Sequence, residues 1–230
     1  MPTNFNGFPN ETFTFLQDLA EHNDREWFDA NRRRYEEFFV APSLAYIEAM
    51  RRPLAKVSPM YQAVPKKVGG SLMRIFRDVR FSSDKRPYKT NIGIHFRHEA
   101  VGDVHGPGLY VHIDTSQCFI AAGIWHPASD VLKAIREAID GRPSDWKKAR
   151  DHKAFHSRYE LAGDALKRPP QGFDADHPYV DDLRRKDFIG VANLDAAAVM
   201  SPGFVNDSIV LFKAATPLSR FLCEAIGVPF

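Results

Sequence analysis

The order in which two hydrophobic periodicities follow each other along the chain is what most restricts its fold. Apolar side chains recur at helical spacing through residues 11–50, and they alternate with polar side chains in short runs between residues 72 and 125. Helical spacing returns in residues 131–139 and 202–226. The two periods distinguish amphipathic helices from half-buried strands. Because helices flank the run of strands and do not alternate with them, the pattern predicts an α+β fold, with a central, mainly antiparallel sheet flanked by helices.

The strand-like segments predict a meander of antiparallel hairpins. Each segment is short, rich in β-branched or aromatic residues, and followed by a turn signal such as Ser82–Pro87. Four consecutive strands are therefore expected, at Leu72–Phe81, Ile92–Arg97, Leu109–Asp114 and Phe119–Trp125.

The last third of the chain is more polar, and shorter elements are expected there. A strand is predicted over residues 159–166, a short helix over 180–186 and a short strand over 188–192. Residues 202–226 are predicted to form one terminal amphipathic helix. A chain of 230 residues is long enough to bury a substantial core, so residues 1–230 are interpreted as a single α+β domain.

Composition restricts the compartment and the partners. Two cysteines in a chain of this size suit a reducing compartment, and the start of the sequence lacks the pattern of a secretory signal peptide. No apolar run approaches the length of a membrane span, so a cytoplasmic protein without a membrane partner is expected. The formal net charge of +2 is low for a nucleic-acid-binding protein, which makes nucleic acid a disfavoured partner without excluding it.

Positive charge is concentrated in the segment RIFRDVRFSSDKRPYKTN, residues 74–91. It holds six Arg and Lys residues against two Asp residues. Arg forms bidentate hydrogen bonds with carboxylate or phosphate, Lys supplies a point charge, and hydroxyl groups add donors. The segment is therefore a candidate site for a small anionic ligand, with binding residues Arg77, Arg80, Lys85, Arg86, Tyr88, Lys89 and Asn91.

The alternation of side chains puts Arg77 on the same strand face as Ile75, Val79 and Phe81. A guanidinium group in apolar surroundings needs a partner, because an unpaired buried charge is very costly. Either an acidic side chain or a bound anion can fill that role. The structural alternative to a ligand site is a hairpin whose cations are all paired with acids of the protein.

The histidines offer a second set of candidates. His112 and His126 lie on adjacent predicted strands and could converge with Asp114 as a metal site or a general base. Histidines at the surface or in structural hydrogen bonds are the alternative. Because the spacing of metal ligands is missing, no metal and no cofactor are expected. Catalytic residues stay undetermined, although Asp78, Asp84 or His112 could serve as an acid or base.

Several longer stretches resemble a family of conserved hypothetical proteins, DUF2461. The similarity includes FLQDLAEHNDREWFDANRRRYEEF, RIFRDVRFSSDKRPYKTNIGIHF, YVHI at 110–113, AAGIWHP at 121–127 and LKRPPQGF at 166–173, and it extends over nearly the whole chain. The family has no established activity, so the resemblance implies no catalytic role for any residue. It does favour a functional interpretation of the basic segment.

Two functions are therefore expected as alternatives. The first is binding of a phosphate- or carboxylate-bearing small molecule at residues 74–91, with the question of an enzymatic reaction left open. The second is a non-enzymatic module that grips an acidic protein surface or a nucleic-acid backbone. A concave pocket favours the first and a flat exposed ridge the second. The sequence does not determine the oligomeric state.

Overall fold

The computed structural model describes residues 5–102 and 105–230 and contains a six-stranded sheet. The strand order is β1-β2-β3-β4-β6-β5, and every neighbouring pair is antiparallel. The central part is a meander of three strands, followed by β6, which pairs with β4 along its whole length. The strands are β1 (Tyr61–Gln62), β2 (Ile92–His98), β3 (Gly108–Ile113), β4 (Cys118–Ile124), β5 (Glu160–Ala162) and β6 (Phe188–Leu194).

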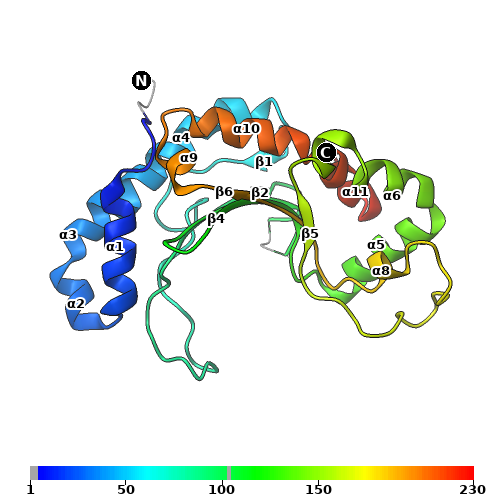
Figure 1. Cartoon of the computed structure of the whole chain (residues 1–230), viewed down its shortest axis with the longest axis horizontal. Coiled ribbons are helices and arrows are strands. Elements are labelled where there is room, and N and C mark those ends of the chain that lie inside the picture. Colours follow the sequence, from blue (N-terminus) through cyan, green and yellow to red (C-terminus); the bar gives the residue numbers. More distant parts are fainter. Residues whose placement is uncertain (1–4, 103–104) are drawn as a thin grey trace.

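Helices cover one face of the sheet and both of its ends. Figure 1 shows the sheet as an arch with α4 (Ala41–Ala55), α9 (Ala196–Met200) and α10 (Phe204–Ala214) above it. The first helices form one end of the arch: α1 (Asn10–Glu21), α2 (Arg25–Ala30), α3 (Arg32–Arg34) and the π-helical segment η1 (Tyr35–Val40). The other end consists of α5 (Ser129–Gly141), α6 (Pro143–Arg150), α7 (Lys153–His156), α8 (Val180–Leu183) and α11 (Thr216–Ala225).

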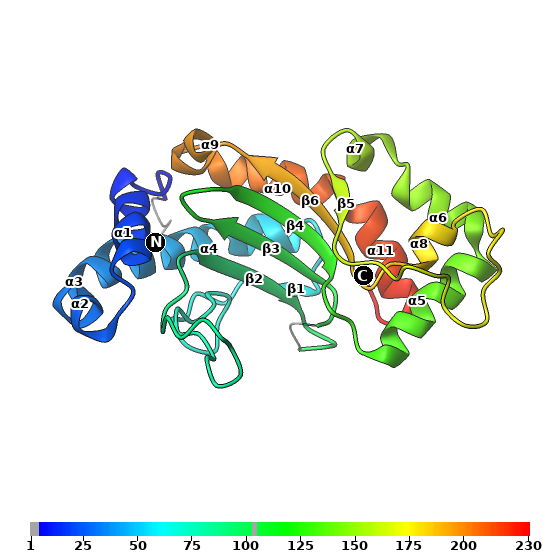
Figure 2. The same ribbon diagram turned by 60° about the horizontal axis from the view of Figure 1, so that its bottom comes forward.

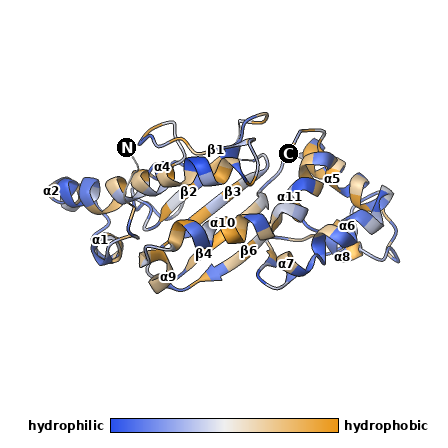
Figure 3. Ribbon diagram, turned by 90° about the horizontal axis from the view of Figure 1, so that it is seen from above, coloured by the Kyte–Doolittle hydropathy of each residue, from blue (hydrophilic) through white to orange (hydrophobic). Residues whose placement is uncertain are grey.

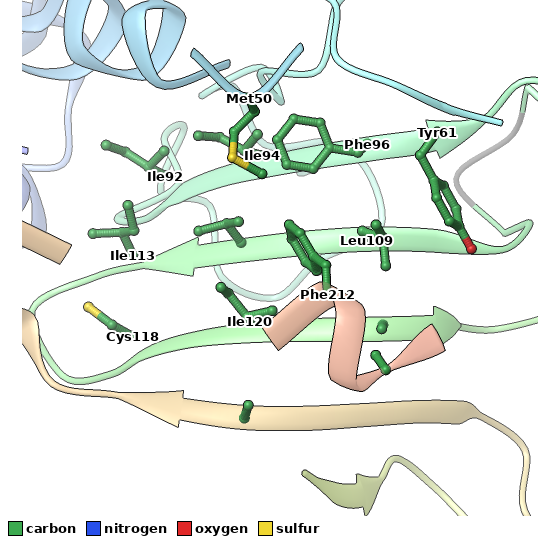
Figure 4. Packing of buried hydrophobic residues seen from close by; sticks show 14 of the residues in the cluster. Met50, Tyr61, Ile92, Ile94, Phe96, Leu109, Ile113, Cys118, Ile120 and Phe212 are labelled. Atoms are coloured by element: carbon green, nitrogen blue, oxygen red, sulfur yellow. The ribbon is translucent and has the colours of Figure 1, made fainter. Parts of the chain in front are cut away.

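The core lies between the convex face of the sheet and the helices that run over it. Figure 4 shows Met50 of α4 against Ile94 and Phe96 of β2, and Phe212 of α10 near Leu109 and Ile120 of the next two strands. The rings of Phe96 and Phe212 are 6.0 Å apart between centroids, and all six residues are at most 1% exposed. Seen from above, α4 and α10 lie side by side across the strands (Figure 3). The burial of these apolar faces is the main driving force for the fold. Because side chains alternate along a strand, the residues between these buried ones point to the opposite, concave face of the sheet.

The predicted fold class is confirmed, since a mainly antiparallel sheet is flanked by helices. Three strands of the predicted meander are present as β2, β3 and β4. The later predictions at 159–166, 180–186 and 188–192 correspond to β5, α8 and β6. No helix in the part of the chain that the structure describes is both long and apolar enough to span a bilayer.

The predicted first strand, Leu72–Phe81, is wrong. Only isolated bridges occur there, between Leu72 and Ile94 and between Phe76 and Tyr88. Beyond Met73 the chain leaves β2 and bonds to residues 87–89 of its own loop, and the Asp78 carboxylate accepts a hydrogen bond from the backbone N–H of Arg80 at 3.3 Å. A local side-chain bond of this kind bends the backbone in competition with a strand ladder. Strand β1 pairs with the other end of β2, at Arg97 and His98.

The single terminal helix predicted over 202–226 is also wrong in detail. The chain forms two helices, α10 and α11, which meet at Ala215. Pro217 stands in the first turn of α11, where its missing N–H costs nothing because that donor has no partner inside the helix. Pro42 does not interrupt the helical course of the chain, because it stands in the first turn of α4, which follows η1 directly.

Candidate functional site

The concave face of the sheet contains a cavity of about 380 Å³. Figure 2 shows this face, with β2, β3 and β4 uncovered by any helix. We call this cavity the sheet cup. Its walls combine small residues, aromatic rings and a few polar side chains: Met73, Lys89, Asn91, Gly93, His95, Gly106, Gly108, Tyr110, His112, Phe119, Ala121, Ala122, Gly123, Trp125 and Ile189.

Glycines in the strands make room for the rings that lie across the floor of the sheet cup. A Cβ atom at Gly108 would stand 2.0 Å from Nε2 of His95, and one at Gly93 would stand 2.8 Å from the hydroxyl of Tyr110. Neither distance is possible without a shift of these rings. The glycines therefore let His95 and Tyr110 lie flat on the neighbouring strand, and this arrangement leaves the space above them open.

Alternate residues of β3 form a hydrogen-bonded chain on the concave face. Tyr110, His112 and Asp114 are two positions apart, so their side chains point to the same side of the strand. The hydroxyl of Tyr110 lies 3.1 Å from Nδ1 of His112, and Nε2 of His112 lies 2.9 Å from Oδ2 of Asp114. The amide nitrogen of Asn91 is a further 3.4 Å neighbour of Nδ1.

Asp114 uses its two carboxylate oxygens for different tasks. Oδ1 accepts hydrogen bonds from the backbone N–H groups of Ser116 and Gln117 and from the Ser116 hydroxyl, at 2.6–2.8 Å. Oδ2 is left for His112. Burial alone would raise the pKa of Asp114, but the bonds from His112, Ser116 and Gln117 together hold it below its usual value.

An ionised Asp114 determines the tautomer of the imidazole ring. A carboxylate only accepts, so Nε2 of His112 carries the hydrogen and Nδ1 is left as an acceptor beside Tyr110. The ring is held in place by Phe119 on the next strand, at 4.6 Å between centroids and 6° between planes. The result is a fixed histidine whose unprotonated nitrogen is next to the sheet cup.

Burial shifts the pKa values of two side chains that line the sheet cup. Burial raises the pKa of the Tyr110 hydroxyl to about 12, opposed by a hydrogen bond with Asn91, so Tyr110 stays protonated at neutral pH. Burial, together with the charge of Arg74, lowers the pKa of Lys89. Within the described residues, Lys89 forms no salt bridge, which distinguishes it from Arg77, Arg80 and Arg86.

The remaining predicted cations lie in the basic loop, which we define as residues 74–87. In Figure 1 this loop extends from the sheet on its uncovered side. Arg77 and Arg86 both contact Asp84, at 2.7 and 2.8 Å, and Arg80 contacts Asp78 at 2.7 Å. Lys85 donates to a backbone carbonyl of the same loop. The acidic partner that the sequence demanded for Arg77 is thus a neighbour within the loop.

Tyr88 anchors the base of the basic loop. Its side chain is 4% exposed, and its ring stacks on Phe28 at 4.1 Å between centroids. The side chain of Asn23 bonds both the N–H and the carbonyl of Tyr88. Of the seven predicted ligand-binding residues, Lys89 and Asn91 line the sheet cup, whereas Tyr88 is buried against Phe28 of α2.

The predicted convergence of histidines with Asp114 holds for His112, whereas His126 lies elsewhere. The backbone N–H of His126 donates to Oδ1 of the buried Asp187 at 2.7 Å. The described residues contain no group of three or more His, Cys, Asp or Glu side chains that could hold a metal ion.

Sequence reasoning missed Tyr110, His95 and the glycines of the floor. One signal could have found them. In YVHID, residues 110–114, every second residue is polar, which puts three polar side chains in a row on one strand face. A polar row opposite a fully apolar face, next to strands that carry glycines on the same side, indicates a cavity over the sheet.

The family model for DUF2461, described as a conserved hypothetical protein, matches residues 11–221. The chain belongs to the DUF2461 family. The match includes every strand, the basic loop and the sheet cup. Searches of curated proteins and of solved structures gave no match.

Proposed function

We propose that the sheet cup binds a small organic anion, with Lys89 as the cation that recognises it. The observation that carries the proposal is the position of Lys89. It is a half-buried ammonium group, without a salt bridge to the described residues, in a cavity whose walls are mainly apolar. A charge in such surroundings gains far more from an anion than a solvated surface lysine does.

The shape and lining of the sheet cup indicate the rest of the ligand. A volume of about 380 Å³ is near the lower end of the range for small-molecule sites, which suits a metabolite and not a polymer. Phe119, Trp125 and Met73 supply apolar contact, and glycines and alanines form a flat floor. A planar, apolar body that carries one carboxylate or phosphate group fits this lining.

The energy available is sufficient for a specific site. A hydrogen bond to a charged group contributes about 1.5–3 kcal/mol. Asn91 adds a neutral donor beside His112, 3.4 Å from its ring nitrogen. With the burial of an apolar body at about 25 cal/mol per Å², micromolar affinity is within reach after the entropy cost of association.

One observation favours the second function, a module that grips an acidic surface. Phe81 in the basic loop is 97% exposed and Phe76 is 51% exposed, next to Arg80 and Arg74. Exposed rings among cations are suited to stacking against nucleotide bases or to packing on an acidic partner. The internal pairing of Arg77, Arg80 and Arg86 reduces the charge that this surface can offer.

Two matched lysine variants separate the functions. Purified protein is screened by thermal shift against phosphate, sulfate, sugar phosphates, aliphatic and aromatic carboxylates, nucleotides and a short oligonucleotide. The hits are then titrated against Lys89→Met, in the sheet cup, and Lys85→Met, in the basic loop. Both variants remove one ammonium group and keep a long apolar side chain.

We expect a small carboxylate or phosphate to raise the Tm of the native protein. A ligand at 100 times its Kd stabilises by about 2.7 kcal/mol, which is a shift of several degrees. Lys89→Met should weaken binding about 10-fold or more, in line with the loss of one charge-assisted hydrogen bond. Lys85→Met should leave it unchanged. The opposite ranking, or a shift with the oligonucleotide alone, would contradict the proposal and favour the loop.

A further inference from the structure

The polar end of the sheet cup presents one donor and one acceptor side by side. The Tyr110 hydroxyl is protonated at neutral pH and donates to Nδ1 of His112, the acceptor nitrogen of the neutral ring, at 3.1 Å. A substrate that offers both an acceptor and a hydrogen takes the place of this internal bond. An enolisable group, O=C–C–H, offers the complementary pair, since its carbonyl oxygen accepts and the neighbouring carbon carries the acidic hydrogen.

The other titratable groups of the lining support proton transfer as the chemistry. Within the described residues, the titratable side chains of the sheet cup are Lys89, His95, Tyr110 and His112. These are groups that bind charge or transfer protons. The mainly apolar walls lower the local dielectric constant and so strengthen their electrostatic contacts.

We propose that the sheet cup is an active site for keto–enol proton transfer on a small carbonyl-bearing anion such as a 2-oxo acid. This inference rests on the proposed function, because the anionic group of the substrate is held by Lys89. His112 is the general base and Tyr110 the hydrogen-bond donor to the carbonyl oxygen. Asp114 is a positioning residue, which acts through the ring of His112.

The step balances in protons and electrons. The hydrogen on the carbon next to the carbonyl group moves to Nδ1 of His112, and the ring becomes an imidazolium. The electron pair of the broken C–H bond becomes the C=C bond of the enolate, and the carbonyl π pair moves to oxygen. Tyr110 donates a hydrogen bond to that oxygen, and Asp114 stabilises the imidazolium through Nε2. Return of the proton completes the exchange, so no oxidant or reductant takes part.

The two separate roles of the Asp114 oxygens allow a sharp test. In Asp114→Asn the side-chain oxygen can still accept from Ser116 and Gln117, so the turn is preserved. The amide nitrogen then faces Nε2 of His112 and donates to it. That contact favours the tautomer with hydrogen on Nδ1, which removes the base without removing the ring. A matched control is Asp174→Asn, an exposed aspartate that accepts a backbone N–H in a distant loop.

The experiment follows deuterium uptake by NMR. Phenylpyruvate and 2-oxobutyrate are incubated with full-length protein in D₂O, and the loss of the C–H signal is compared with buffer alone. The native protein and Asp174→Asn should accelerate exchange. Asp114→Asn and His112→Gln should lower the acceleration about 100-fold or more, which is the usual contribution of a general base. In both variants the Kd of the probe should stay within about 3-fold of the native value.

The ¹⁵N shifts of the His112 ring supply a readout that does not depend on turnover. We expect the Nε2–H tautomer in the native protein and in Asp174→Asn, and the Nδ1–H tautomer in Asp114→Asn. Equal exchange rates in native protein and Asp114→Asn would overturn the proton-transfer proposal. So would binding of both probes without any exchange. Absence of binding, or an affinity that Lys89→Met leaves unchanged, would overturn the proposed anion site itself. The failure of the anion site and the failure of the proton-transfer proposal are thereby distinguished.

Discussion

The basic loop, residues 74–87, directly precedes Lys89 and Asn91 of the sheet cup in the sequence. The two regions differ in how their charged groups are placed. The loop has many charges, which are mostly exposed and paired with each other, as Arg80 is with Asp78. The sheet cup has few, and they are half-buried, as are Lys89 and His112. Exposed ion pairs contribute little to binding or stability, whereas a desolvated charge interacts strongly. The placement of a charge therefore indicates a site better than the density of charge in the sequence.

The largest expected effect comes from a glycine on the floor of the sheet cup. Gly123 has φ of +133°, and a Cβ atom there would stand 2.0 Å from the carbonyl oxygen of Phe188 on β6. Gly123→Ala should lower the free energy of unfolding by about 3 kcal/mol or more, from backbone strain together with overpacking. Urea denaturation monitored by circular dichroism measures it.

Gly172→Ala is the matched control, since Gly172 also has a positive φ, +90°, but a Cβ atom there would meet nothing within 4 Å. Its cost should be about 1–2 kcal/mol, from strain alone. Equal losses for the two variants would show that the floor of the sheet cup is no more tightly packed than an exposed loop, and the comparison between the regions would fail.

A second prediction concerns alkaline pH, where the buried hydroxyl of the sheet cup titrates. The pKa of Tyr110 is raised from 10.0 to about 12 by burial. A raised folded-state pKa means that the unfolded chain loses its proton first, so stability is full below pH 10 and falls as pH rises toward 12. This group alone contributes a slope of about 1.4 kcal/mol per pH unit in that window.

Tyr110→Phe should remove that slope. The free energy of unfolding from urea titrations between pH 9 and pH 11 should fall less steeply in the variant than in the native protein. Identical slopes would mean that the hydroxyl of Tyr110 is solvated in the folded state, and the description of the sheet cup as a desolvated site would be wrong.

The smallest expected effect lies in the basic loop. Arg86 and Arg77 hold the pKa of Asp84 far below its usual range, through hydrogen bonds from both guanidinium groups. Asp84→Asn should leave the Tm nearly unchanged, because both ion pairs are partly exposed to solvent. It should increase the rate of tryptic cleavage within residues 77–85, because the loop opens locally without unfolding the core.

Asp78→Asn, which releases Arg80 alone, should increase cleavage less than Asp84→Asn does. A fall in Tm of several degrees with either variant would contradict the comparison, since it would show that the loop's ion pairs support the core.

The sequence predicted the parts of the fold that depend on local periodicity. In β2 the apolar residues Ile92, Ile94 and Phe96 alternate and are all fully buried, in agreement with the strand that this alternation predicts. The pairing of β6 with β4 and the place of β1 beside β2 depend on contacts between distant residues, and no local pattern contains them. The predicted strand at 72–81 failed because Asp78 and Asp84 form turns with residues two positions on.

The candidate site was predictable in part. Lys89 and Asn91 were selected for their charge and their hydrogen-bonding groups, and both line the sheet cup. Tyr110 was missed because its role depends on the ring of His112 two positions along and on the space that Gly93 leaves across the sheet. Such proximity arises from strand register, which the sequence shows only after the pairing is known.

The most direct test of the central claim is a ¹⁵N–¹H NMR titration of the native protein with phenylpyruvate as the probe. The amides of Gly93, Gly108 and Gly123 mark the floor of the sheet cup, and those of residues 78–86 mark the basic loop. We predict saturable shifts of the three glycine amides with little change in the loop. Shifts confined to residues 78–86 would contradict the account and identify the loop as the binding site.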